Sequence, residues 1–212
     1  KVALPGPKSR IYDLHFSPDG TRLATSHKNG EIQLWNTKTG DAGVRFQAHR
    51  GAASTLAFSP NGKLLVSGGY DRLVRIWDAQ DGRQVAVFEG HTEIILGVDF
   101  APSGKSVASS GVDATVRIWN VEQHQRRSGN RGHGAPVVEA SYSPDGATIA
   151  TGGDDSAIRL WDAETGQLKR VLRGHSEVVL SVAYSTDGDL IASGSLDGYV
   201  RLWDPSTGKE RR

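Results

Sequence analysis

The 212-residue sequence contains no cysteine and no methionine. Because cysteine is absent, the chain can form neither disulfides nor thiolate metal sites. The lack of disulfides is compatible with a reducing compartment, so we expect a cytoplasmic protein. The lack of methionine predicts a processed chain, an excised domain or an engineered protein. No apolar run comes near the ~20 residues of a membrane-spanning helix, and no signal-peptide pattern is present.

The sequence also lacks an excess of charge of either sign. It has 25 basic and 24 acidic residues, for a formal net charge of +1. This balance gives no reason to expect binding to nucleic acid or to an anionic membrane. The fractions of hydrophobic residues, 37%, and charged residues, 23%, are ordinary for a globular protein.

Aromatic residues make up only 7% of the chain, but five of them are regularly spaced tryptophans. Each follows the previous one by 42 residues, at Trp35, Trp77, Trp119, Trp161 and Trp203. Turn-forming tetrapeptides keep the same step, as in Ser17-Pro18-Asp19-Gly20 and Ser143-Pro144-Asp145-Gly146. A constant step without insertion or deletion predicts a protein built from structural repeats.

Each repeat has the pattern of short β-strands. In the third repeat, the sequence predicts strands over residues 94–100, 105–110 and 115–119, separated by turn signals. The fourth strand is clearest in the preceding repeat, over residues 84–88. Helix signals are missing. One four-stranded sheet cannot bury both faces alone, so copies are expected to pack face to face around a common axis.

Several features give this chain a resemblance to the WD-repeat β-propeller family. They are Gly90-His91, Gly132-His133 and Gly174-His175, with Trp77-Asp78, Trp161-Asp162 and Trp203-Asp204. Trp35-Asn36 and Trp119-Asn120 depart from the pattern. The resemblance covers essentially residues 1–212 and implies an all-β propeller region with five four-stranded blades. The repeats run over residues 7–48, 49–90, 91–132, 133–174 and 175–212, with a further strand at residues 1–6.

The resemblance implies a buried polar tetrad in four of the repeats, in which an indole, a hydroxyl, an imidazole and a carboxylate are hydrogen-bonded in a chain. The tetrads are His49, Ser67, Asp71, Trp77; His91, Ser109, Asp113, Trp119; His133, Thr151, Asp155, Trp161; and His175, Ser193, Asp197, Trp203. The same residue types make up a catalytic triad. However, no Gly-x-Ser-x-Gly elbow exposes a nucleophile, and four copies argue against one active site. We therefore interpret the tetrads as structural.

The first repeat lacks two tetrad members, with Pro7 in place of histidine and Asn29 in place of aspartate. Terminal repeats are often atypical, so we expect this blade to be the least rigid. Residues 2–4 align with the fourth strands of later repeats, which places the amino-terminal strand to complete the last blade. Since members of the family usually have about seven blades, we expect a portion of a larger propeller or multidomain chain. Closure of five blades, or pairing with a second copy, remains the alternative.

The family's contact positions place a partner-binding surface on the narrow face of the propeller. The positions we select from them are Arg10, Tyr12, Tyr70, Ile94, Leu96, Val112, Val138, Val178, Leu180 and Leu196. Most of them are apolar, and clustered apolar residues at a surface mark protein interfaces. The alternative is that the valines and leucines only extend the strand packing inward.

Other signals carry less weight. Residues 123–131 contain three arginines that could contact phosphates, but a solvated outer strand explains them better. The arginines two residues before four tryptophans, Arg75, Arg117, Arg159 and Arg201, are expected to pack their stems between blades. His15 and His27 lack ligand-like neighbours, and the spacing of acidic residues predicts no metal site.

We therefore expect a non-catalytic scaffold that binds a protein or peptide, with no cofactor and no contact with nucleic acid or membrane. The oligomeric state stays open. One alternative is a regulatory module of a larger signalling protein with a kinase or NTPase domain, and a weaker one is a reader of nucleic acid or modified peptides. An enzyme would need titratable residues converging from several blades, and the inward strand positions are mostly small or apolar.

Overall fold

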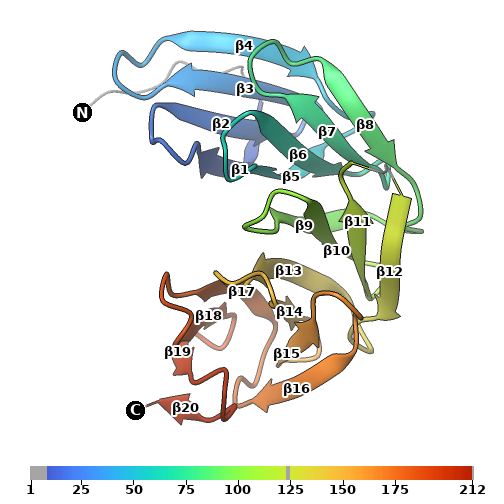
Figure 1. Cartoon of the computed structure of the whole chain (residues 1–212), viewed down its shortest axis with the longest axis vertical. Helices are drawn as coiled ribbons and strands as arrows, with labels where there is room; N and C mark the ends of the chain where they lie inside the picture. The colour runs from blue at the N-terminus through green and yellow to red at the C-terminus, as the bar shows by residue number, and fades with distance from the viewer. Residues whose placement is uncertain (1–8, 123–124, 212) are drawn as a thin grey trace.

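The structure is a computed structural model that describes residues 9–122 and 125–211; over residues 125–131 it describes the backbone alone. In these residues, twenty strands form five antiparallel four-stranded sheets, and there is no helix, hence none that could span a membrane. The predicted all-β fold with five blades is thereby confirmed. Figure 1 shows the blades in chain order around an arc, with the first strand of each blade innermost.

Every blade consists of four strands that are consecutive in the chain. Blade 1 contains β1 (Ile11–Phe16), β2 (Arg22–His27), β3 (Glu31–Asn36) and β4 (Ala42–Gln47). Blade 2 contains β5 (Ala53–Phe58), β6 (Leu64–Gly69), β7 (Val74–Asp78) and β8 (Gln84–Phe88). Blade 3 contains β9 (Ile95–Phe100), β10 (Ser106–Gly111), β11 (Thr115–Asn120) and β12 (Gln125–Arg131). Blade 4 contains β13 (Val137–Tyr142), β14 (Thr148–Gly153), β15 (Ala157–Asp162) and β16 (Leu168–Arg173). Blade 5 contains β17 (Val179–Tyr184), β18 (Ile191–Ser195), β19 (Val200–Trp203) and β20 (Glu210–Arg211).

The strands lie where the sequence pattern predicts them. β9, β10 and β11 differ from the predicted segments by one residue at one or both ends, and β8 coincides with its segment. The arginine-containing segment at 123–131 forms β12 from Gln125 onward, paired with β11. Its side chains lie outside the described residues, so the interpretation of its arginines stays a prediction.

The hydrophobic core lies between blades rather than within them. One cluster joins Val74 and Ile76 on β7 of blade 2 to Val98 and Phe100 on β9 of blade 3. The equivalent cluster at the last junction joins Ile158 on β15 to Val179 and Val182 on β17. Burying apolar side chains is the main favourable contribution to folding. Each blade is therefore stabilised largely by its neighbours.

The two ends of the arc do not meet in Figure 1. The carboxyl-terminal segment begins a fourth strand of blade 5: Trp203 pairs with Glu210, and Leu202 with Arg211. β20 therefore occupies the outer edge of blade 5, the place predicted for the amino-terminal strand. Residues 1–6, which would form that strand, lie outside the described residues.

Candidate functional site

The four tetrads have nearly identical hydrogen-bond geometry. In blade 2, His49 Nδ1 lies 2.8 Å from Asp71 Oδ1, His49 Nε2 lies 2.7 Å from Ser67 Oγ, and the indole of Trp77 donates to Ser67 Oγ at 2.8 Å. A carboxylate can only accept, so Nδ1 carries the proton and Nε2 accepts from the hydroxyl. The indole, the hydroxyl, the imidazole and the carboxylate of the tetrad are thereby all hydrogen-bonded.

The other blades repeat these bonds at the same repeat positions. The histidine-to-carboxylate distances are 2.9 Å for His91–Asp113, 2.6 Å for His133–Asp155 and 2.8 Å for His175–Asp197. The histidine-to-hydroxyl distances are 2.7 Å to Ser109, 2.9 Å to Thr151 and 2.7 Å to Ser193. Trp119, Trp161 and Trp203 each donate to that hydroxyl at 2.8 Å.

Burial keeps these hydroxyls from acting as nucleophiles. Ser67, Ser109 and Thr151 are fully buried, and Ser193 is nearly so. Each oxygen accepts from an indole and donates to an imidazole, so no substrate carbonyl can approach it. Burial also lowers the pKa of His49 and His133, which favours the neutral imidazole that this hydrogen-bond pattern requires. The geometry supports internal bracing and no triad chemistry.

Arginines add a second partner to three tetrad carboxylates, a contact that the sequence did not predict; the third and longest places Arg117 Nη2 3.7 Å from Asp113 Oδ2. Arg75 Nη1 lies 2.7 Å from Asp71 Oδ2, and Arg159 Nη1 lies 2.6 Å from Asp155 Oδ2. Although burial alone would raise the pKa of Asp71, its bonds with His49 and Arg75 hold that pKa well below its usual range. Arg201 differs, because it pairs with Glu210 at 2.8 Å.

Blade 1 braces its tryptophan with a histidine from another position. Trp35 donates to Thr25 Oγ1 at 3.0 Å, and that oxygen lies 2.9 Å from His27 Nε2. His27 is fully buried and bonded to Thr25, a role that the sequence analysis did not assign to it. Blades 2 and 4 cannot place a histidine there: a Cβ on the equivalent Gly69 would lie 2.3 Å from His49 Nδ1, and one on Gly153 would lie 2.5 Å from His133 Nδ1.

The predicted partner positions gather at one end of the blades. In each blade, one backbone hydrogen bond joins the turn after the second strand to the loop that enters the blade. The residue just before the tetrad carboxylate position donates its N–H, and the carbonyl of the residue just before the first strand accepts it. These bonds are Lys28 to Arg10, Tyr70 to Ala52, Val112 to Ile94, Asp154 to Pro136, and Leu196 to Val178, with lengths of 2.8–3.0 Å. We call the ten predicted partner residues the loop rim.

The loop rim is partly exposed and partly packed. Its exposed members are Arg10, Tyr12, Tyr70, Val112, Leu180 and Leu196. Its half-buried members are Ile94, Leu96, Val138 and Val178. The partial burial of the second group agrees with the alternative that some of these side chains extend the strand packing inward, but does not test it. Among the exposed residues, Tyr12 and Tyr70 bring their ring centroids to 6.0 Å, and the Arg10 guanidinium lies 5.5 Å from the Tyr12 ring.

A cavity of about 210 Å³ lies at the inner strands. Most of its lining is small or apolar, as we expected of the inward positions, but Asp13, His15, Asp99 and Glu139 also converge there from three blades. Burial raises the pKa of Asp99 to about 6. Burial, with the charges of Asp13 and Asp99, raises the pKa of Glu139 to about 7.

Two of these carboxyl groups are hydrogen-bonded within the fold. Asp13 Oδ2 accepts from the backbone N–H of Leu56 at 3.0 Å, and Asp99 Oδ2 accepts from that of Tyr142 at 2.9 Å. Each bond joins the inner strand of one blade to that of the next. Within the described part of the chain, no group of three acidic or histidine side chains is arranged to hold a metal ion.

Comparison with known proteins agrees with the repeat geometry. The family model for the WD domain, G-beta repeat, matches five times, over residues 1–36, 42–78, 82–120, 125–162 and 166–204. No curated protein matches the chain. Together the five matches cover most of the sequence, and each one ends at or next to the residue that follows a tetrad-position tryptophan. The chain belongs to the WD-repeat family, and its five sheets are the blades of a WD-repeat propeller.

Proposed function

We propose that this chain is a non-catalytic scaffold that binds a protein or peptide partner on the loop rim. WD repeats are generally protein-interaction modules, and the family is typically non-catalytic. The observation that carries the proposal is the exposure of large side chains at the same end of blades 1, 2, 3 and 5. Leu196 is 62% exposed, Leu180 is 44% exposed and Tyr70 is 42% exposed. Exposed apolar residues gathered on one surface are typical of binding sites.

The charge around the loop rim suggests how a partner is oriented. The exposed cations Arg10, Lys28, Arg50 and Arg72 lie at the ends of blades 1 and 2. The exposed acids Glu93, Asp154 and Glu177 lie at the same ends of blades 3, 4 and 5. A partner with an acidic segment over blades 1 and 2, followed by apolar and basic segments, has the complementary pattern. Such complementarity contributes to orientation and to the association rate.

The test is capture of a partner with variants of the most exposed rim residues. The double variant Val112→Asp, Leu196→Asp places two charges on the rim without entering a core cluster. We expect it to retain the fold, measured by circular dichroism, and to lose the proteins that the parent retains from a lysate. Leu168→Asp is the matched control, because Leu168 is 48% exposed on the outer strand β16. Equal capture by parent and double variant would place the binding surface elsewhere.

A further inference from the structure

Blade 1 has an exposed apolar face on the side away from blade 2. Ile11, Leu14 and Phe16 on β1 are 49%, 54% and 55% exposed. At the same repeat positions in blade 3, Ile95, Val98 and Phe100 are at most 5% exposed. These positions are buried in blades 2 and 3 because they pack against the preceding blade. We call Ile11, Leu14 and Phe16 the leading face.

Blade 5 has the complementary exposed face on its opposite side. Val200 and Leu202 on β19 are 77% and 43% exposed. The equivalent residues Val74 and Ile76 of blade 2 are fully buried, as part of the cluster that includes Phe100 of blade 3. Ala192 on β18, half-buried, belongs to the same face. We call Ala192, Val200 and Leu202 the trailing face.

The two faces are the two halves of an interface that the chain already forms at each of its junctions. At the first junction, Ile32 and Leu34 of blade 1 pack with Leu56 and Phe58 of blade 2. At the last, Ile158 and Leu160 of blade 4 pack with Val182 of blade 5. Since the residue types recur with the 42-residue step, a trailing face and a leading face are shaped for one another. Within one molecule they lie at opposite ends of the arc (Figure 1).

We propose that the trailing face of one molecule binds the leading face of a second copy of this chain. The contact is the blade-to-blade packing of the interior, with Val200 and Leu202 of one copy against Leu14 and Phe16 of the other. It joins two different surfaces, so each added copy again presents one free face of each kind. Such an interface builds a closed ring or a filament rather than a symmetric dimer. The loop rim takes no part in it.

Two variants that each destroy one face provide the test. Phe16→Asp removes the leading face, and Val200→Asp removes the trailing face; both side chains are exposed in the single copy, so both variants should fold. We expect the parent to show a weight-average mass that rises with concentration in sedimentation velocity. Each variant alone should remain at the monomer mass. An equimolar mixture of the two should form a 1:1 dimer and nothing larger, since only one productive pair of faces remains.

Several results would overturn the proposal. One is a parent that stays monomeric over the whole concentration range, whether its ends remain free or close on each other. Another is a dimer of Val200→Asp alone, because it would show a symmetric contact between leading faces. A mixture that stays monomeric also contradicts it. Leu14→Asp and Leu202→Asp give an independent second pair, and Leu168→Asp, a charge on an exposed outer strand, should associate like the parent.

Discussion

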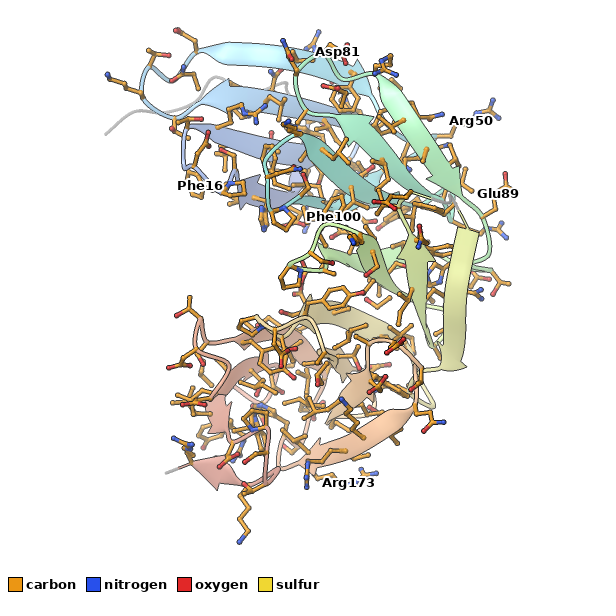
Figure 2. The ribbon with its side chains drawn as sticks, viewed as in Figure 1. Phe16, Arg50, Asp81, Glu89, Phe100 and Arg173 are labelled. Atoms are coloured by element: carbon orange, nitrogen blue, oxygen red, sulfur yellow. The ribbon has the colours of Figure 1, made fainter. Side chains whose placement is uncertain are left out.

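Blades 1 and 3 carry the same repeat 84 residues apart, yet equivalent residues have different surroundings. Phe100 is 4% exposed between two blades, whereas Phe16 is 55% exposed at the end of the arc, as the labelled side chains in Figure 2 allow the reader to compare. Asp113 accepts from His91 and Thr115, whereas its exposed counterpart Asn29 donates to half-buried Glu31. The strand pattern is thus a property of the repeat. The contribution of each residue to the stability of the fold depends on the neighbouring blades.

We expect the largest difference between blades 1 and 3, measured as the loss of unfolding free energy on mutation, at the inner-strand phenylalanine. Phe100→Ala should lower the free energy of unfolding by about 3–5 kcal/mol, because it leaves a cavity between blades. Phe16→Ala should change it by less than about 1 kcal/mol, since Phe16 is already in contact with solvent. Urea titration of both variants, at concentrations where the chain is monomeric, measures the two values. Equal losses would mean that blade 1 has a covered leading face.

We expect the second-largest difference in stability loss when the residue at the tetrad carboxylate position is mutated in the two blades. Asp113→Ala leaves the buried His91 Nδ1–H without its acceptor, and an orphaned buried donor costs about 1–3 kcal/mol. Asn29→Ala, at the same repeat position, removes only exposed hydrogen bonds and should cost under about 0.5 kcal/mol. Denaturant midpoints at constant m-value compare them. An unchanged midpoint for Asp113→Ala would refute the bracing role of the tetrads.

His27, which braces Trp35 in blade 1, should contribute to stability in a pH-dependent way. His27→Ala should cost about 1–2 kcal/mol at pH 8, because Thr25 loses a buried partner and a void remains. Burial lowers the pKa of His27 below 6.5, so the stability it contributes is present above pH 6.5 and lost as the pH falls below it. The difference between parent and variant should therefore shrink from pH 8 to pH 5. A difference independent of pH would mean that His27 is not buried as a neutral ring.

For Glu139 at the inner strands, we expect a stability contribution with the opposite pH dependence and a smaller size. The pKa of Glu139 is raised from 4.5 to about 7, so its favourable contribution is present below pH 4.5 and lost as the pH rises through about 7. Glu139→Gln should therefore be more stable than the parent by about 1 kcal/mol at pH 8, and not at pH 4. Chemical denaturation of both proteins at the two pH values gives this difference. A variant less stable than the parent at pH 8 would show that the ionised carboxylate is well solvated or paired.

Much of the fold follows from the sequence, because every repeat carries the same strand and turn signals. The tetrad residues also follow, since their spacing is constant in four repeats. His27 could have been found from its repeat column: Gly69, Gly111 and Gly153 occupy this position in blades 2–4, and histidine replaces glycine in the repeat that has Pro7. The residue types at this repeat position do not reveal the contact by themselves. They do not show that the ring of His27 lies where the tetrad histidine rings lie in the other blades.

The convergence of Asp13, Asp99 and Glu139 is harder to predict. Asp13 and Glu139 share a repeat position, but Asp99 lies two residues further along its strand, so no repeat pattern groups the three. They meet only when the inner strands of several blades are placed around one axis. The exposure of Phe16 and Val200 likewise depends on which blades have neighbours. Single repeats contain no information about either.

Exchange of the indole N–H protons tests the central claim, that each blade is braced through its tryptophan, most directly. The five tryptophans give five separate signals in a ¹⁵N-correlated NMR spectrum, and each indole donates to a buried hydroxyl. We expect slow exchange with solvent for all five, with Trp35 faster than Trp119 because its histidine has no carboxylate partner among the described residues. Rapid exchange of the indoles of blades 2–5 in the folded protein would contradict that claim.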